Sequence, residues 1–143
     1  MTKDELFRVE EAAWKPLHDL THELRTDTAE CPYTDLWTVK DGVAHIACWQ
    51  AEAAQMLTRI REGTYDGWDE GREDEINASF HASTRELPLD GVIASLHASR
   101  TRMLEELDLL PEELLDDEAR SWFVESGNEH YAEHLDGLRR AVG

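Results

Sequence analysis

Apolar residues recur at helical spacing along almost the whole chain, and no segment alternates as a strand does. The clearest repeat is formed by Leu6, Val9, Ala13, Leu17, Leu20 and Leu24. Residues three or four apart share one face of an α-helix, whereas a half-buried strand requires a period of two. The periodicity therefore predicts an all-α protein.

Start and stop signals divide this pattern into separate helices. Thr2 with Glu5, and Thr38 with Asp41, have the spacing of capping boxes. The expected helices cover about 3–26, 38–62, 73–86, 90–108 and 119–141. Pro16 lies inside the first helix and is expected to kink it, because proline lacks a backbone donor. Residues 27–37 are expected to form a loop.

Four of the expected helices are long enough to form a four-helix bundle. The chain has 143 residues, which fits one domain, 1–143. The connection at 63–89 is long enough to cross the length of the bundle. The helices at 38–62 and 90–108 are therefore expected to run parallel, joined by a long crossover.

Charge and composition limit the partners that this chain can have. The formal net charge is −18, so nucleic acids and anionic membranes would be repelled. No apolar run approaches the roughly 18 residues of a membrane span. Two cysteines, Cys31 and Cys48, are too few for a disulfide framework. Without a signal-peptide pattern at the first residues, we expect a cytoplasmic protein.

Three histidines form the best candidate site. His130 and His134 are four residues apart, on one face of a helix, and His45 lies near the inward stripe of its helix. Three such imidazoles can hold a divalent transition metal, and zinc, nickel and iron all remain open. The alternative is hydrogen-bonded histidines at a core boundary. His18 and His22 share the spacing but face away from the apolar stripe.

Other residues on the inward faces are also candidates for a site, most of them with a structural alternative. Arg100 either contacts an acidic group of a substrate or forms an ion pair with a side chain such as Glu52. Cys48 is a ligand, a nucleophile or a small buried hydrophobe. Trp49 is a candidate substrate-binding residue. Four tryptophans either line an aromatic pocket or pack in the core: Trp37, Trp49, Trp68 and Trp122.

The segment WTVKDGVAHIACW at 37–49 resembles the DinB-like bundle superfamily. That group includes the N-terminal domains of mycothiol-dependent maleylpyruvate isomerases, and its second helix typically reads W-[ST]-x-x-[DE]-x-[LV]-A-H-[LI]-A-x-W. The match continues through LHASRTRML at 96–104 to HYAEHL at 130–135. Gln50 departs from the pattern, because many relatives have an acidic residue there.

The resemblance implies an up-down-down-up bundle with a divalent metal held by His45, His130 and His134. Known members include transferases and isomerases that use low-molecular-weight thiols. We therefore expect a metal-dependent enzyme that activates a small thiol, or water, for attack on a small electrophile. The alternative is a metal-free bundle that binds a small molecule or confers self-resistance. A homodimer is expected from the resemblance and from two loop aromatics, Tyr65 and Trp68.

Overall fold

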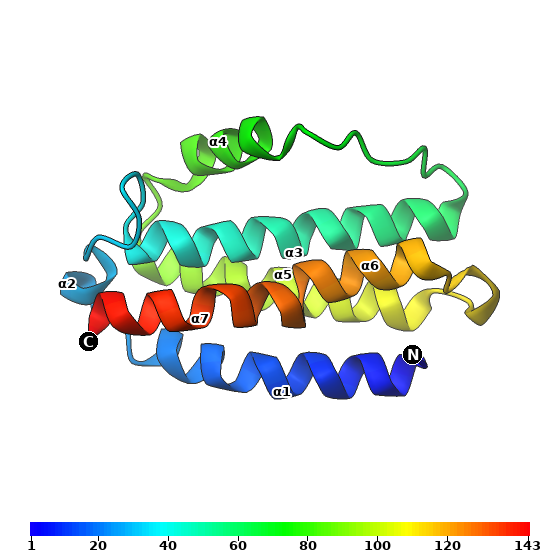
Figure 1. The fold of residues 1–143 in the computed structure, drawn as a ribbon, viewed down its shortest axis with the longest axis horizontal. Coiled ribbons are helices and arrows are strands. Elements are labelled where there is room, and N and C mark those ends of the chain that lie inside the picture. The colour runs from blue at the N-terminus through cyan, green and yellow to red at the C-terminus, as the bar shows by residue number, and fades with distance from the viewer.

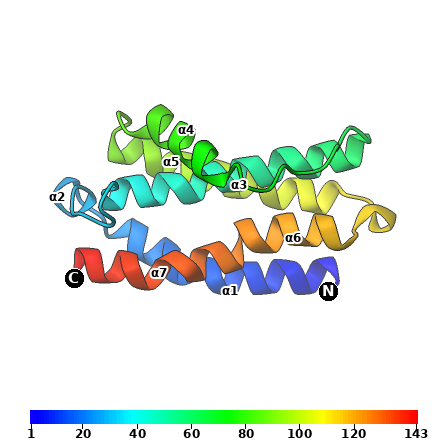
Figure 2. The same cartoon turned by 45° about the horizontal axis from the view of Figure 1, so that its top comes forward.

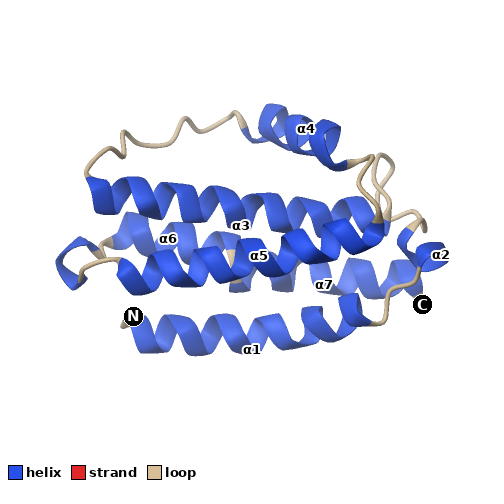
Figure 3. Cartoon of the chain, turned by 180° about the vertical axis from the view of Figure 1, so that it is seen from behind, coloured by secondary structure: helices blue, strands red, loops and turns tan.

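The computed structural model describes residues 1–143 as a helical bundle without a β-strand (Figures 1 and 3). Its long helices are α1 (Lys3–His22), α3 (Val39–Glu62), α5 (Leu89–Leu109) and the consecutive pair α6 (Asp117–Ser126) and α7 (Asn128–Val142). Helices α3 and α5 run parallel, and α1 and the α6–α7 pair run in the opposite direction (Figure 1). The prediction of an all-α, up-down-down-up bundle is confirmed.

The long connection between α3 and α5 returns along the length of the bundle (Figures 1 and 2). It contains α4 (Glu73–Thr84), which packs on α3 and has no buried residue of its own. Two further short elements are α2 (Thr26–Ala29), in the segment expected to be a loop, and the 3₁₀ turn Glu112–Leu114. None of the helices has the length and apolar character needed to cross a membrane.

The ends of α3 follow from its flanking residues. The Thr38 hydroxyl accepts a hydrogen bond from the Asp41 amide, and the Asp41 carboxylate accepts one from the Thr38 amide, at 3.2 and 3.0 Å. This pair is the expected capping box. The helix ends at Gly63, whose φ of 76° is the left-handed conformation that glycine adopts most easily. In α1 the helix continues through Pro16 and ends at His22, earlier than predicted.

The fourth long helix was predicted to be continuous over 119–141, and that prediction is wrong. The helix is interrupted at Gly127, between α6 and α7. The Gly127 amide donates to the Phe123 carbonyl oxygen at 2.8 Å, and a Cβ at position 127 would lie 2.6 Å from that oxygen. Only glycine allows this approach without a shift. The apolar repeat runs through the break, so periodicity does not reveal it.

A buried polar network links the four long helices. Glu10 in α1 is fully buried and receives hydrogen bonds from Arg100 in α5, at 2.7 and 2.8 Å. Its carboxylate also accepts from the Tyr131 hydroxyl in α7 at 2.8 Å. Gln50 in α3 donates to that same hydroxyl at 2.9 Å. Apolar side chains surround this network on both sides, in two clusters of buried residues.

We predict that Gly127→Ala destabilises the fold, because the new Cβ would meet the Phe123 carbonyl. The free energy of unfolding should fall by about 1–3 kcal/mol, as for other overpacked positions. Urea denaturation followed by circular dichroism measures the change. Gly91→Ala is the control, since a Cβ there makes only ordinary contacts, at 3.6 Å to Pro88. Equal stability of both variants would contradict this account of the break.

Candidate metal centre

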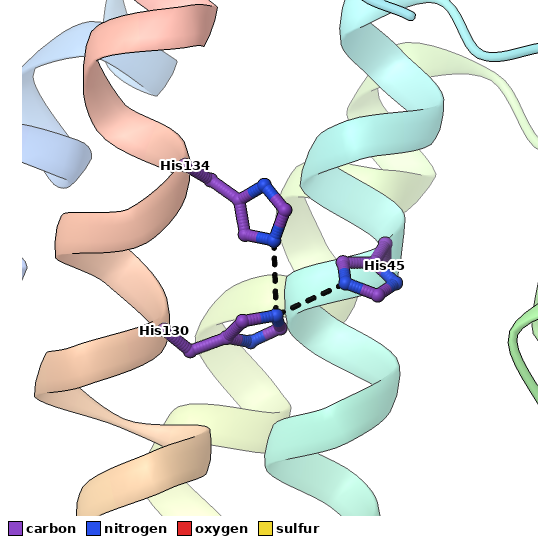
Figure 4. A group of neighbouring side chains, drawn as sticks. All are labelled: His45, His130 and His134. Atoms are coloured by element: carbon purple, nitrogen blue, oxygen red, sulfur yellow. Dashed lines mark hydrogen bonds between the residues drawn. The ribbon is translucent and has the colours of Figure 1, made fainter. Parts of the chain in front are cut away.

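Three histidine side chains converge between α3 and α7 (Figure 4). The Nε2 atom of His130 lies 3.0 Å from Nε2 of His45 and 3.1 Å from Nε2 of His134. His45 and His130 are only 9% and 8% exposed. These are the three histidines that the sequence singled out. After the interruption at Gly127 the helix resumes at Asn128, just before His130. Both histidines of α7 lie on the side that faces α3.

A tyrosine that the sequence reading missed fixes one of the three rings. The Tyr33 hydroxyl lies 2.6 Å from Nδ1 of His134. Its ring lies between Gly42 in α3 and Gly137 in α7, where a Cβ would approach ring atoms to 2.7 and 2.8 Å. The two glycines thus make room for Tyr33, and Tyr33 directs the Nε2 atom of His134 toward its partners. Glycines inside helices were the only signal in the sequence.

The histidines are held in their neutral form. Burial lowers the pKa of His45 to about 4, and the neighbouring His134 lowers it further in the same direction. Burial likewise lowers the pKa of His130 to about 3, with His134 and His45 adding to the effect. The pKa of His134 is also lowered by burial. A neutral imidazole keeps the lone pair that a metal ion requires.

The donor set fits a divalent transition metal. The three Nε2 atoms face one another, and Nδ1 of His134 faces the Tyr33 hydroxyl, while Nδ1 of His45 and Nδ1 of His130 are buried without a hydrogen-bond partner. A neutral imidazole whose proton is on Nδ1 presents the lone pair of Nε2. One cation accepting three lone pairs would satisfy all three Nε2 atoms together. Ligands at the roughly 2.0–2.1 Å of zinc–imidazole bonds and at tetrahedral angles are about 3.3 Å apart. The two separations from Nε2 of His130, 3.0 and 3.1 Å, are close to this value, and all three ligand atoms lie within 4.8 Å of one another.

The histidines open onto a cavity of about 870 Å³. Four tryptophans line it: Trp37, Trp49, Trp68 and Trp122. The Trp37 ring is 4.7 Å from the His45 ring, and Trp49 donates its Nε1 hydrogen to Asn77 at 2.7 Å. Trp68 and Asn77 come from the α3–α5 connection, which therefore closes one side of the cavity. The tryptophans therefore line the cavity, Trp49 among them, and they also pack in the core: Trp122 is a buried core residue, and Trp49 and Trp68 pack against the same cluster.

Of the two roles predicted for Arg100, a substrate contact or an ion pair, the structure shows the ion pair. Arg100 is absent from the lining of the cavity, and its Nε and one terminal nitrogen donate to Glu10. A fully buried carboxylate needs a cationic partner, which explains the pairing. The partner in the ion pair is thus Glu10 and not Glu52, which lies beside a separate hollow with Arg59.

Cys48 and the second histidine pair lie apart from the centre. Burial raises the pKa of the Cys48 thiol to about 11, and it lines a small separate hollow with Ala44. It is therefore a protonated, largely apolar side chain. His18 and His22 stack on each other at 5.9 Å between ring centroids, with His97 beside His18.

The two loop aromatics pack within the chain. Trp68 contacts Trp49 and Trp122 edge to face, at 5.8 and 5.1 Å between ring centroids. Tyr65 donates to Glu118 and accepts from Trp122 at 3.0 Å. They therefore do not form a free apolar surface, and the expected homodimer rests on the family resemblance alone.

Two solved structures share the fold. An uncharacterised protein from Escherichia coli UTI89 matches with a TM-score of 0.83 and 14% identity, over 98% of this chain and 92% of that chain. A protein described as a four-helix bundle protein matches with a TM-score of 0.68 and 22% identity, over 97% and 99%. No family model matches the chain, and no curated protein matches it significantly. At these identities the similarity establishes the fold only.

The lowered pKa values predict that the metal-free protein loses stability between pH 6.5 and pH 4. In that range the unfolded histidines, with pKa values near 6.5, bind protons that His45 and His130 in the folded state do not. At pH 5.5 each histidine should cost about 1 kcal/mol. Urea denaturation in the presence of a chelator measures this dependence. His130→Gln should show a shallower decline, and an unchanged decline would refute the assignment.

Proposed function

We propose that this protein is a DinB-like, metal-dependent enzyme that activates a small nucleophile in the cavity beside its three histidines. The nucleophile is a low-molecular-weight thiol or water, and the second substrate is a small electrophile. The observation that carries the proposal is the meeting of three neutral Nε2 atoms, from His45, His130 and His134, at the wall of a large cavity. A transferase, an isomerase and a hydrolase all fit this chemistry.

A divalent ion on three neutral imidazoles would keep open coordination positions and lower the pKa of a bound thiol or water. The chain supplies the remaining parts. Tyr33 holds the ring of His134, and burial raises the pKa of the Tyr33 hydroxyl so that it keeps its proton. Trp37 packs against His45. His45 and His130 are largely shielded from solvent, and four tryptophans line the cavity beside them.

The competing proposal is a metal-free protein that binds or sequesters a small molecule. Its support is the cavity itself, which has the volume of a small-molecule site and aromatic walls. Elemental analysis of untagged protein separates the two proposals. Less than about a tenth of an equivalent of zinc, nickel or iron, with no uptake on addition, would favour the metal-free protein. Sedimentation of the same sample tests the proposed homodimer.

We predict that replacing any one of His45, His130 and His134 by alanine weakens metal binding at least about tenfold. Two protein ligands are too few for a tight site of this kind. Competition with a chromophoric chelator measures the affinity. His18→Ala and His22→Ala are the controls and should retain the affinity of the unmodified protein. Loss of affinity in His18→Ala, with full affinity in His45→Ala, would move the site to the other histidine pair.

Tyr33→Phe should also weaken metal binding, by about tenfold, because it removes the hydroxyl bonded to Nδ1 of His134. The ring stays between its two glycines, so thermal stability should change little. Tyr65→Phe is the matched control, since Tyr65 bonds to Glu118 and Trp122 rather than to a histidine. Equal affinity of both variants would show that Tyr33 does not orient the site.

A further inference from the structure

The cavity beside the histidines is lined by carboxylates and by no lysine or arginine. Its acidic residues are Glu70, Glu73, Glu118, Glu125 and Glu133. They come from both sides, because the first two lie at the start of the α4 segment and the others in α6 and α7. No lysine or arginine belongs to the lining, although the chain contains 14 of them. A bound molecule would therefore meet negative charge on two sides and no positive side chain.

These carboxylates are not used to hold the fold together by ion pairs. None of the five forms a salt bridge, whereas other acidic residues pair with arginines. Glu73 accepts from the Gly71 amide at 2.9 Å, and Glu118 accepts from Tyr65, so these two are fixed in place. Glu70 and Glu125 have no hydrogen-bonding partner within the chain. Their charges are directed at the cavity and the solvent.

The aromatic wall favours the same kind of ligand. Trp68 is nearly perpendicular to Trp49 and to Trp122, at 70° and 88° between ring planes. In each pair the edge of one indole meets the face of the other, and all three indoles line the cavity. The face of an indole ring attracts cations through its quadrupole, most strongly where water is excluded. Carboxylates and indole faces together form a common type of site for organic cations.

Buried polar groups distinguish this cavity from a merely acidic surface. His45 and His130 are more than nine-tenths buried, line the cavity, and each have an unpartnered Nδ1. Burial of such groups without a hydrogen-bond partner costs free energy. The acidic and aromatic residues line the same cavity as these histidines.

We infer that the ligand of this cavity is a small organic cation, such as an amine or an amidine, with an apolar part. The apolar part packs on the tryptophans, and the positive group lies among the glutamates. The inference deepens the proposed function by naming the substrate class, and its reaction at the histidines rests on that function. Binding of the cation itself requires only the cavity. An anionic substrate would have no positive side chain to meet, because Arg100 is committed to Glu10.

Three probes with one carbon skeleton test this inference: 4-phenylbutylamine, 4-phenylbutanol and 4-phenylbutyrate. They carry positive, zero and negative charge at neutral pH. Titrations of the full-length protein, followed by tryptophan fluorescence and ligand-observed NMR, should be run with a chelator and again with zinc. With the chelator, the amine should bind at least about tenfold more tightly than the alcohol, and the carboxylate most weakly. Equal binding, no saturable binding of the amine at millimolar concentration, or preference for the carboxylate would overturn the inference.

The double variant Glu70→Gln/Glu125→Gln tests the role of the carboxylates. It removes one charge from each side of the cavity without touching a histidine or a hydrogen bond. Affinity for the amine should fall about three- to tenfold, whereas affinity for the alcohol should not change. Glu105→Gln/Glu113→Gln changes the net charge equally, away from the cavity, and should keep amine affinity within about twofold. An equal loss in both variants would assign the effect to overall charge and refute the site.

The proposed metal centre and the proposed cation site can be refuted independently of each other. His45→Ala should lose metal binding and still prefer the amine over the alcohol. If the unmodified protein takes up no metal but prefers the amine, the proposed enzyme is wrong and the cation site stands. If it takes up metal but does not discriminate among the probes, the cation site is wrong and the metal centre stands.

Discussion

The fully buried carboxylate of Glu10 is the constraint on which the bundle depends. A buried charge is tolerated only with a close partner and with its remaining lone pairs satisfied. Here Arg100 provides two bonds and Tyr131 a third, and Gln50 completes the chain through the tyrosine hydroxyl. These residues belong to α1, α5, α7 and α3. A shift of α1, α5 or α7 along its neighbours would break a bond to a charge that water cannot reach, and a shift of α3 would break the bond between Gln50 and Tyr131.

The same network sets the separation of the candidate metal ligands. Tyr131 follows His130 directly in α7, and Gln50 lies little more than one turn after His45 in α3. Joining Tyr131 to Gln50 therefore fixes the two ligand-bearing segments against each other. An ionised glutamate at position 50 could not donate to a hydroxyl that already donates to a carboxylate. The amide of Gln50 is thus the side chain that this network requires.

Periodicity and spacing predicted the parts of the molecule that depend on neighbours in sequence. The long helical segments, the capping box of α3 and the inward faces of the three histidines follow from spacings of three and four residues. The parallel pair follows from the length of the connection between its two helices. The features that the sequence did not predict are mainly contacts between segments far apart in the chain. Tyr33 meets His134 across 101 residues, and Arg100 meets Glu10 across 90. The break at Gly127 escaped because the apolar stripe continues through it.

Electrostatics connects the two proposals made for the cavity. Three neutral imidazoles leave the charge of a divalent ion uncompensated by its own ligands, and the five surrounding carboxylates outnumber its two positive charges. The cavity would remain negative with the ion in place, so a metal centre and a cationic substrate are compatible there. Screening limits exposed charges to about 8 Å at physiological salt. The proposed preference for a cationic ligand therefore depends on the carboxylates that line the cavity. The net charge of −18 alone does not create this preference.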